Sequence, residues 1–183
     1  MTSWNLIEDA IRKWVRDASR LADGQVIWSD QDGPRPLGVF ITIRLGDLLP
    51  LGAVDETATD YDPTGGPGEE IVTTVRGVRE FPVSIQCFGT DTVGRDTARA
   101  LLSRVQTALG LPSVREALGT VGLSPFDAGQ VRNLSVILDA QFEGRALLEV
   151  RFYVVEEMTE RTTYISTVEV TDESTDRTFT VTV

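Results

Sequence analysis

Apolar residues recur at steps of three and four over residues 4 to 21, with charged residues between them. This spacing is typical of an amphipathic helix with one buried face, and Gly24 is expected to end it. The buried face comprises Trp4, Ile7, Ile11, Trp14, Val15, Ala18 and Leu21. The same spacing predicts a second helix over residues 92 to 109. Ser113 and Glu116 have the spacing of a capping box, which predicts a short third helix.

Elsewhere apolar and polar residues alternate, which predicts β-strands. The strands are expected over residues 26–29, 39–45, 71–89, 133–142 and 145–155. The third of these is either one long strand or two that join at a bend near Gly77. Glu143 and Gly144 indicate a tight turn between the last two. Pro82 has no N–H to donate, so its part of the chain is expected to begin a strand or to lie at a sheet edge.

Two segments depart from this pattern. Residues 46–70 carry seven carboxylates and no basic residue, with Pro and Gly throughout, and are expected to form a long acidic loop. Residues 164–183 are rich in Thr and Val around the turn sequence TDESTD, which predicts a C-terminal β-hairpin. An isolated hairpin is marginally stable, so it should dock on this domain or on a neighbouring copy.

These patterns together predict an α+β protein in which a mostly antiparallel sheet packs against two main helices. We expect one domain over residues 1–158 and a C-terminal hairpin extension over residues 159–183.

Composition narrows the classes of function. Of the 183 residues 41% are hydrophobic, but no apolar run approaches the roughly 18 residues that span a bilayer, and the N-terminus does not read as a secretory signal. The formal charge of −11 argues against wrapping nucleic acid, although it would keep a passing duplex from adhering. Histidine is absent, which removes the commonest general base and metal ligand. Cys87 is the only cysteine and alternates with apolar residues, so we expect a packed, unreactive thiol.

The segment VIWSDQDGPRP, residues 26–36, is the first candidate for chemistry. Asp30 and Asp32 have the Asp-x-Asp opening of an EF-hand calcium loop, but Pro34 stands at its fifth position and no helix ends directly before Asp30. A rigid turn, in which both carboxylates accept backbone N–H bonds, is therefore favoured over a metal site.

The acidic segment is the second candidate. Asp55, Glu56, Asp60 and Asp62 could hold a divalent ion, could form a flexible contact loop, or could simply be solvated. The glycines of TGGPGEE lack the Lys and the Ser or Thr of a phosphate-binding loop. The sequence assembles no catalytic site, and we expect neither enzymatic activity nor a cofactor.

Three further motifs follow one another along the chain. The first, W-x-D-Q-x-x-P-R-P, comprises Trp28, Asp30, Gln31, Pro34, Arg35 and Pro36. The second, S-x-Q-x-F-G, comprises Ser84, Gln86, Phe88 and Gly89. The third, F-E-G-R-A, comprises Phe142, Glu143, Gly144, Arg145 and Ala146. With the predicted helices, over roughly residues 4 to 155, the chain resembles the neck or tail terminator (tail completion) family of long-tailed bacteriophages.

The resemblance implies a structural virion protein of the tail–neck region, made in the cytoplasm of the bacterial host. Similar proteins form a ring, usually of six copies, that caps the tail tube and joins it to the head connector. DNA passes through the lumen without specific binding. The implied partners are further copies of this chain, the tail tube protein and the head–tail connector or neck protein, with a sheath as a further candidate.

Two alternatives stay open. One is a tail tube or baseplate subunit of a phage or phage-derived contractile system. The other is a metal-dependent hydrolase that uses Asp30, Asp32 and the carboxylates of the acidic loop.

A ring contact is heterologous, so each subunit needs two different complementary surfaces. We expect one along the strand of Pro82 and the other near the acidic loop or the C-terminal hairpin. Arg35, held between two prolines, is expected to face a carboxylate of a neighbouring subunit. The candidate interface residues are Asp30, Asp32, Arg35, Asp55, Glu56, Asp60, Pro82, Tyr164 and Phe179.

Overall fold

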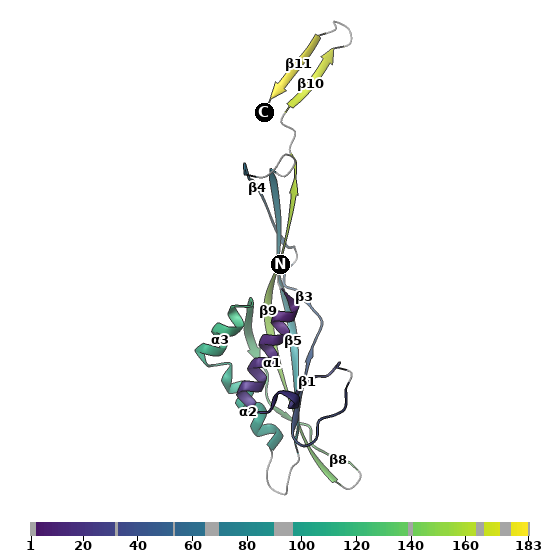
Figure 1. The fold of residues 1–183 in the computed structure, drawn as a ribbon, viewed down its shortest axis with the longest axis vertical. Helices are drawn as coiled ribbons and strands as arrows, with labels where there is room; N and C mark the ends of the chain where they lie inside the picture. Colours follow the sequence, from purple (N-terminus) through teal and green to yellow (C-terminus); the bar gives the residue numbers. More distant parts are fainter. Residues whose placement is uncertain are drawn as a thin grey trace. The chain divides into compact units, whose positions relative to one another are not determined.

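A computed structural model of the chain describes residues 3–31, 33–52, 54–64, 70–89, 97–138, 141–163, 167–172 and 177–182 (Figure 1). The helical elements are α1 (Trp4–Ser19), the 3-10 turn η1 (Asp23–Gln25), α2 (Thr97–Ala108) and α3 (Pro112–Gly119). The strands before α2 are β1 (Val26–Trp28), β2 (Phe40–Leu45), β3 (Leu49–Pro50), β4 (Glu56–Tyr61) and β5 (Ile71–Gly89). The strands after α3 are β6 (Leu123–Ala128), β7 (Arg132–Asn133), β8 (Val136–Leu138), β9 (Gln141–Thr162), β10 (Thr167–Asp172) and β11 (Arg177–Thr182).

The chain divides into two compact units, one of Met1–Ala53 with Gly77–Glu156 and one of Val54–Arg76 with Glu157–Val183. The first unit contains α1, α2 and α3 and a sheet with the strand order β1-β2-β5-β9-β6. The second contains β4 with the adjoining parts of β5 and β9, and the β10–β11 hairpin. Apart from the parallel pair β1–β2, the strand pairs whose registers the structure describes are antiparallel, and with the helices they confirm the predicted α+β class. The division into residues 1–158 and 159–183 stays a prediction.

The core of the first unit lies between α1 and one face of the sheet. The apolar stripe of α1 is buried as its spacing predicts, and Ile7, Ile11 and Val15 are fully inaccessible. Trp14 meets Phe152 of β9 edge to face, with the ring centroids 6.1 Å apart. In Figure 1, α2 and α3 lie next to α1. The helix α1 ends at Ser19, earlier than predicted, because Arg20 adopts the left-handed conformation (φ 61°). The Arg20 N–H donates to the Arg16 carbonyl.

The strand β5 is a single element that runs through Gly77 without a break. Alternation along it buries Phe81, Val83, Ile85 and Cys87 against the helices, and Cys87 is a free, buried thiol. The opposite face of β5 therefore carries the intervening residues, from Pro82 to Phe88. The strand pairs with β2 along one of its edges.

The position predicted for Pro82 was wrong. The strand order places β5 in the interior of the sheet, between β2 and β9, and Pro82 lies neither at the start of the strand nor at an edge. The β2 register ends at the pair Leu45–Val83 and the β3 register begins at Leu49–Glu80, so the missing N–H of Pro82 falls in the gap between them. Its carbonyl still accepts a bond from the Gly46 N–H at 2.7 Å.

The predicted turn at Glu143 and Gly144 was also misplaced. Both residues lie inside β9, and the β8–β9 register pairs Val136 with Glu143 and Leu138 with Gln141. The connection between the two strands therefore precedes Gln141, and residues 139–140 lie outside the described residues.

Three of the described strands, β3, β4 and β6, were not predicted, and β3 lies with β4 within residues 46–70. Within the expected acidic loop, β4 pairs with β5 over Glu56–Tyr61, but all six of its residues are exposed and give no apolar alternation. At the other edge of the sheet, β6 contains Pro125 and a register irregularity between Pro125 and Asp127, so its sequence resembles a loop.

The segment between β1 and β2 connects two adjacent parallel strands, with Val26 opposite Ile41 and Trp28 opposite Ile43. Such a pair cannot be joined by a tight hairpin, so the chain must cross over one face of the sheet. This requirement explains the Pro-rich corner of residues 29–39. Trp28 is half-buried against the core at its start.

No helix in the described part of the chain is long and apolar enough to cross a membrane.

Candidate protein interface

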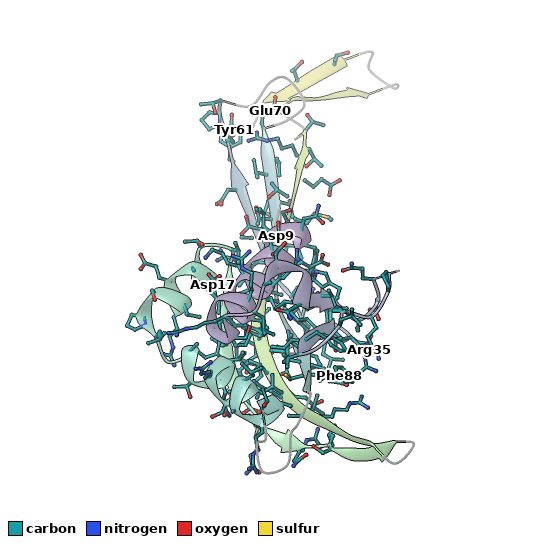
Figure 2. All side chains as sticks on the ribbon, turned by 60° about the horizontal axis from the view of Figure 1, so that its bottom comes forward. Asp9, Asp17, Arg35, Tyr61, Glu70 and Phe88 are labelled. Carbon is teal, nitrogen blue, oxygen red and sulfur yellow. The ribbon has the colours of Figure 1, made fainter. Side chains whose placement is uncertain are left out.

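The crossover segment is fastened to the sheet by Arg35. The rings of Phe40 and Phe88, which face each other across the β2–β5 pair, stack with centroids 4.7 Å apart and planes 7° apart. The Arg35 guanidinium lies 5.0 Å from the Phe40 centroid and 5.1 Å from the Phe88 centroid, within the range of a cation–π contact. Figure 2 shows Arg35 and Phe88 together on the first unit. Arg35 is thus held by aromatic rings as well as by its two flanking prolines.

This contact lies on the sheet face that α1 does not cover. Ile41 and Cys87 point into the core, so their neighbours Phe40 and Phe88 point the other way. Phe40 is nevertheless only 3% exposed, because the stacked ring of Phe88 and the crossover cover it.

Arg145 of β9 approaches the Phe88 ring from the other side of β5. Its guanidinium lies 5.0 Å from the Phe88 centroid, and its Nη2 donates a hydrogen bond to Gln86 Oε1. The Nε atom of Arg145 is buried and has no acceptor among the described residues. We call Arg35, Phe40, Gln86, Phe88 and Arg145 the arginine–phenylalanine cluster.

The cluster unites the three sequence motifs. Arg35 belongs to the first motif, Gln86 and Phe88 to the second, and Arg145 to the third. Arg145 was not among the predicted interface residues, although its motif had been singled out. Strand alternation could have identified it, because Ala146 is buried in the core and the neighbouring Arg145 must therefore lie on the opposite face of the strand.

The other predicted residues of the corner segment contribute less. Asp30 is exposed and accepts a hydrogen bond from Ser29 Oγ at 3.2 Å. The N–H of Gln31 donates to the Trp28 carbonyl, as in a turn. Asp32 lies outside the described residues. Pro82 is half-buried in the middle of the sheet.

The acidic segment is divided between a strand and a turn. Glu56 and Asp60 are exposed on β4, opposite Arg76 and Val72 of β5, while Asp55 precedes the strand. Glu56 and Asp60 form no ion pair with any described residue.

Asp62 follows β4 and is fixed within its own unit. Thr64 donates to Asp62 from its hydroxyl (2.6 Å) and from its backbone N–H (3.0 Å), and Arg161 Nη2 lies 3.0 Å away. These bonds, with that of the Thr64 hydroxyl the largest, hold the pKa of the Asp62 carboxyl below its usual value. Among the described residues, no three Asp, Glu, Cys or His side chains gather closely enough to hold a metal ion.

The two hairpin residues are only partly placed. Tyr164 lies outside the described residues. Phe179 is in β11 and pairs with Val170 of β10. Two positions along the hairpin, Val168 pairs with Val181. Alternate pairs of an antiparallel ribbon share a face, so the register places these four apolar residues on one face of the hairpin.

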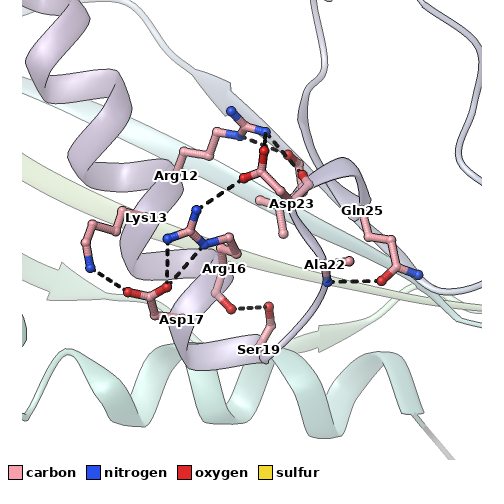
Figure 3. A network of polar contacts seen from close by, with 9 residues as sticks. Arg12, Lys13, Arg16, Asp17, Ser19, Ala22, Asp23 and Gln25 are labelled. Atoms are coloured by element: carbon pink, nitrogen blue, oxygen red, sulfur yellow. Dashed lines mark hydrogen bonds and ion pairs between the residues drawn. The ribbon is translucent and has the colours of Figure 1, made fainter.

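A polar network closes the C-terminal end of α1 (Figure 3). Arg12 donates to the carbonyls of Val26 (3.1 Å) and Asp23 (3.1 Å), which joins the helix to β1 and η1. Arg16 bonds to Asp17 and Asp23, and Lys13 Nζ lies 2.7 Å from Asp17. The hydrogen bond from Lys13 lowers the pKa of the Asp17 carboxyl and outweighs partial burial, with a smaller contribution from Arg16. The network fixes a helix end and forms no reactive site.

A hollow of about 490 Å³ lies beside this network, between α1 and α3. Its walls are mostly apolar, from Ala10, Trp14 and Leu118 among others, and its rim carries Lys13 and Asp17. These two charges are already paired with each other, so the hollow offers no uncompensated charge for a ligand.

No curated protein matches the chain. The family model of the phage neck terminator proteins matches residues 5–179, which is nearly the whole chain and extends the predicted resemblance through the acidic segment into the C-terminal hairpin. This is a family of structural proteins of the phage tail–neck region and is not known for enzymatic activity. With that match, the motifs that meet in the arginine–phenylalanine cluster and the α+β fold have a common explanation: the chain belongs to the phage neck terminator protein family.

Proposed function

We propose that the protein forms a ring, of six copies, that caps the head-proximal end of the tail tube and joins it to the head connector. The match to the neck terminator family over residues 5–179 carries this proposal. Its partners are then the tail tube protein, the connector or neck protein and, in a contractile tail, the sheath. The protein is made in the cytoplasm of the bacterial host and is incorporated into the virion.

The charge of the chain supports a role next to DNA without binding it. Phosphate contacts require clustered Lys and Arg, whereas this chain has a formal charge of −11. A lumen lined by acidic side chains repels a passing duplex and keeps it from adhering to the wall.

The distribution of surfaces supports a closed ring. A heterologous contact needs two different patches on each copy, because one patch of a copy binds the other patch of its neighbour. The arginine–phenylalanine cluster lies in the first unit, and β4 and the C-terminal hairpin belong to the second. We propose that the extension over residues 159–183, with Tyr164 and Phe179, supplies contacts to a neighbouring copy.

The test is to image the purified protein by negative-stain electron microscopy, alone and mixed with tail tubes, and to measure its mass by light scattering. We expect single rings that bind one end of a tube and stop its growth. Protein that stacks into tubes would instead identify a tube subunit, and protein that stays monomeric and leaves tubes unbound would overturn the proposal.

A further inference from the structure

We propose that the arginine–phenylalanine cluster is a carboxylate-binding site that receives the acidic strand β4 of a second copy of this chain. The inference rests on the proposed ring and names the residues of one of its contacts. The occupant is identified by charge: Glu56 and Asp60 of β4 meet Arg145, with Arg35 beside it.

The first step concerns the charge of Arg145. A guanidinium that stacks on a phenyl ring keeps its edge N–H groups available for in-plane acceptors, and a carboxylate can take two of them at once. Among the described side chains, Arg145 bonds only to the neutral amide of Gln86 and has no carboxylate partner. A half-buried charge in this state gains more from an incoming carboxylate than a solvated arginine does.

The second step concerns position. Arg35 and Arg145 both lie about 5 Å from the centroid of Phe88, so two guanidinium groups are held against one ring. The rings fix their directions, which reduces the entropy lost when a partner binds. The described helices bury the alternate residues and leave this face of the sheet to the crossover segment that carries Arg35.

The third step identifies the partner. Some carboxylates of the described residues pair with an arginine or lysine of their own chain, as Asp17, Glu80 and Glu149 do, and others, such as Glu8, Asp9 and Asp47, do not. Glu56 and Asp60 form no such pair, are fully displayed on an edge strand, and share one face of it with Ala58 between them. Residues four apart on a strand are separated by about 13 Å and point to the same face, so both carboxylates approach a partner from one side of the strand.

The fourth step concerns assembly. Copies that each carry a charge of −11 repel one another, so a contact between them requires that an acidic patch meet a basic one. The cluster and β4 are different surfaces of the same chain, and a contact between them repeats from copy to copy until the ring closes.

The experiment is a charge exchange. Arg145→Glu and Asp60→Arg, made separately in the full chain, should each weaken assembly, with an apparent dissociation constant raised by about tenfold or more in sedimentation velocity. The combination of both substitutions should restore assembly at least in part. Asp60 is opposite Val72, so an arginine there meets no like charge on the paired strand. Arg104→Glu, on an exposed position of α2, changes the charge by the same amount and should leave assembly unchanged.

Three results would overturn the assignment. The first is single variants that assemble like the wild type, and the second is a double variant no better than either single one. The third is an Arg145→Glu protein that forms rings but loses binding to duplex DNA in a mobility-shift assay. If Arg145→Glu fails to fold by circular dichroism, Asp60→Arg alone decides, since its side chain is exposed. Wild-type protein that forms no ring would count against the proposed function itself, whereas rings formed by every variant would count against this contact only.

Discussion

Gly46 shows how a single residue adapts the sheet to a proline. A Cβ added at Gly46 would lie 2.5 Å from Pro82 Cγ and 3.2 Å from the Pro82 carbonyl oxygen, closer than van der Waals contact permits. The pyrrolidine ring cannot rotate away as a flexible side chain would. Only glycine therefore allows the chain after β2 to approach Pro82 and bond to its carbonyl.

We predict that Gly46→Ala lowers the free energy of unfolding by about 1–3 kcal/mol, the cost of inserting a methyl group into occupied space. Urea denaturation at a single protein concentration measures the change, because assembly also shifts apparent stability. Gly24→Ala is the matched control, since a Cβ there would meet no atom within 4 Å. Equal stability of the two variants would contradict the close contact with Pro82.

The carboxyl of Asp17 gives a prediction about pH. Its folded pKa is lowered, mainly by the hydrogen bond from Lys13, below an unfolded value of about 3.9. Its contribution to stability is therefore fully present above that pH and is lost as the pH falls through the folded pKa. Because its side chain is 49% exposed, Asp17→Asn should cost no more than about 1 kcal/mol at neutral pH.

The measurement compares thermal unfolding of wild type and Asp17→Asn from pH 7 downward. The two stabilities should converge below about pH 4. Asp9→Asn, on the same helix and without an ion pair among the described residues, should follow the wild type at every pH. A difference between wild type and Asp17→Asn that stays constant into the acid range would show that Asp17 acts through something other than its charge.

At the scale of elements, the sequence predicts the helices and strands whose apolar residues form one buried face. The stripe of α1 and the alternation in β2 and β5 were predicted because one face of each is buried in the same core. β4 has no buried residue, so nothing in its sequence distinguishes it from a loop, and only its pairing with β5 defines it. The turn before β9 was misplaced because Gly144 is also tolerated inside a strand, and the pairing register decides where the turn falls.

The candidate site was predicted in parts for a similar reason. The motifs that contain Arg35, Phe88 and Arg145 were identified from residue types alone. Their meeting depends on which strands are neighbours, and local sequence does not encode the order β2-β5-β9. The predicted display of Arg35 by its flanking prolines thus omitted the aromatic rings over which the guanidinium lies.

At the scale of the whole molecule, the core and the C-terminal hairpin make separate contributions. Among the residues whose burial the structure describes, the hydrophobic core cluster lies between Ile7 and Val154, within the first unit. The hairpin has its own register, with Val168 and Val170 opposite Val181 and Phe179, but a two-stranded ribbon is marginally stable without a surface to dock on. In the proposed ring that surface belongs to a neighbouring copy.

Deletion of residues 164–183 should therefore give a folded protein that no longer assembles. Because the core cluster of the first unit is left intact, we expect the free energy of unfolding to change by no more than about 1 kcal/mol, while light scattering reports a monomer. In the full chain, Phe179→Ser should weaken assembly in the same direction. Glu169→Gln, at a register position on the opposite face of the ribbon, should not. A truncated protein that fails to fold would place the hairpin in the core of its own chain, and a truncated protein that still forms rings would assign the contact to the cluster and β4 alone.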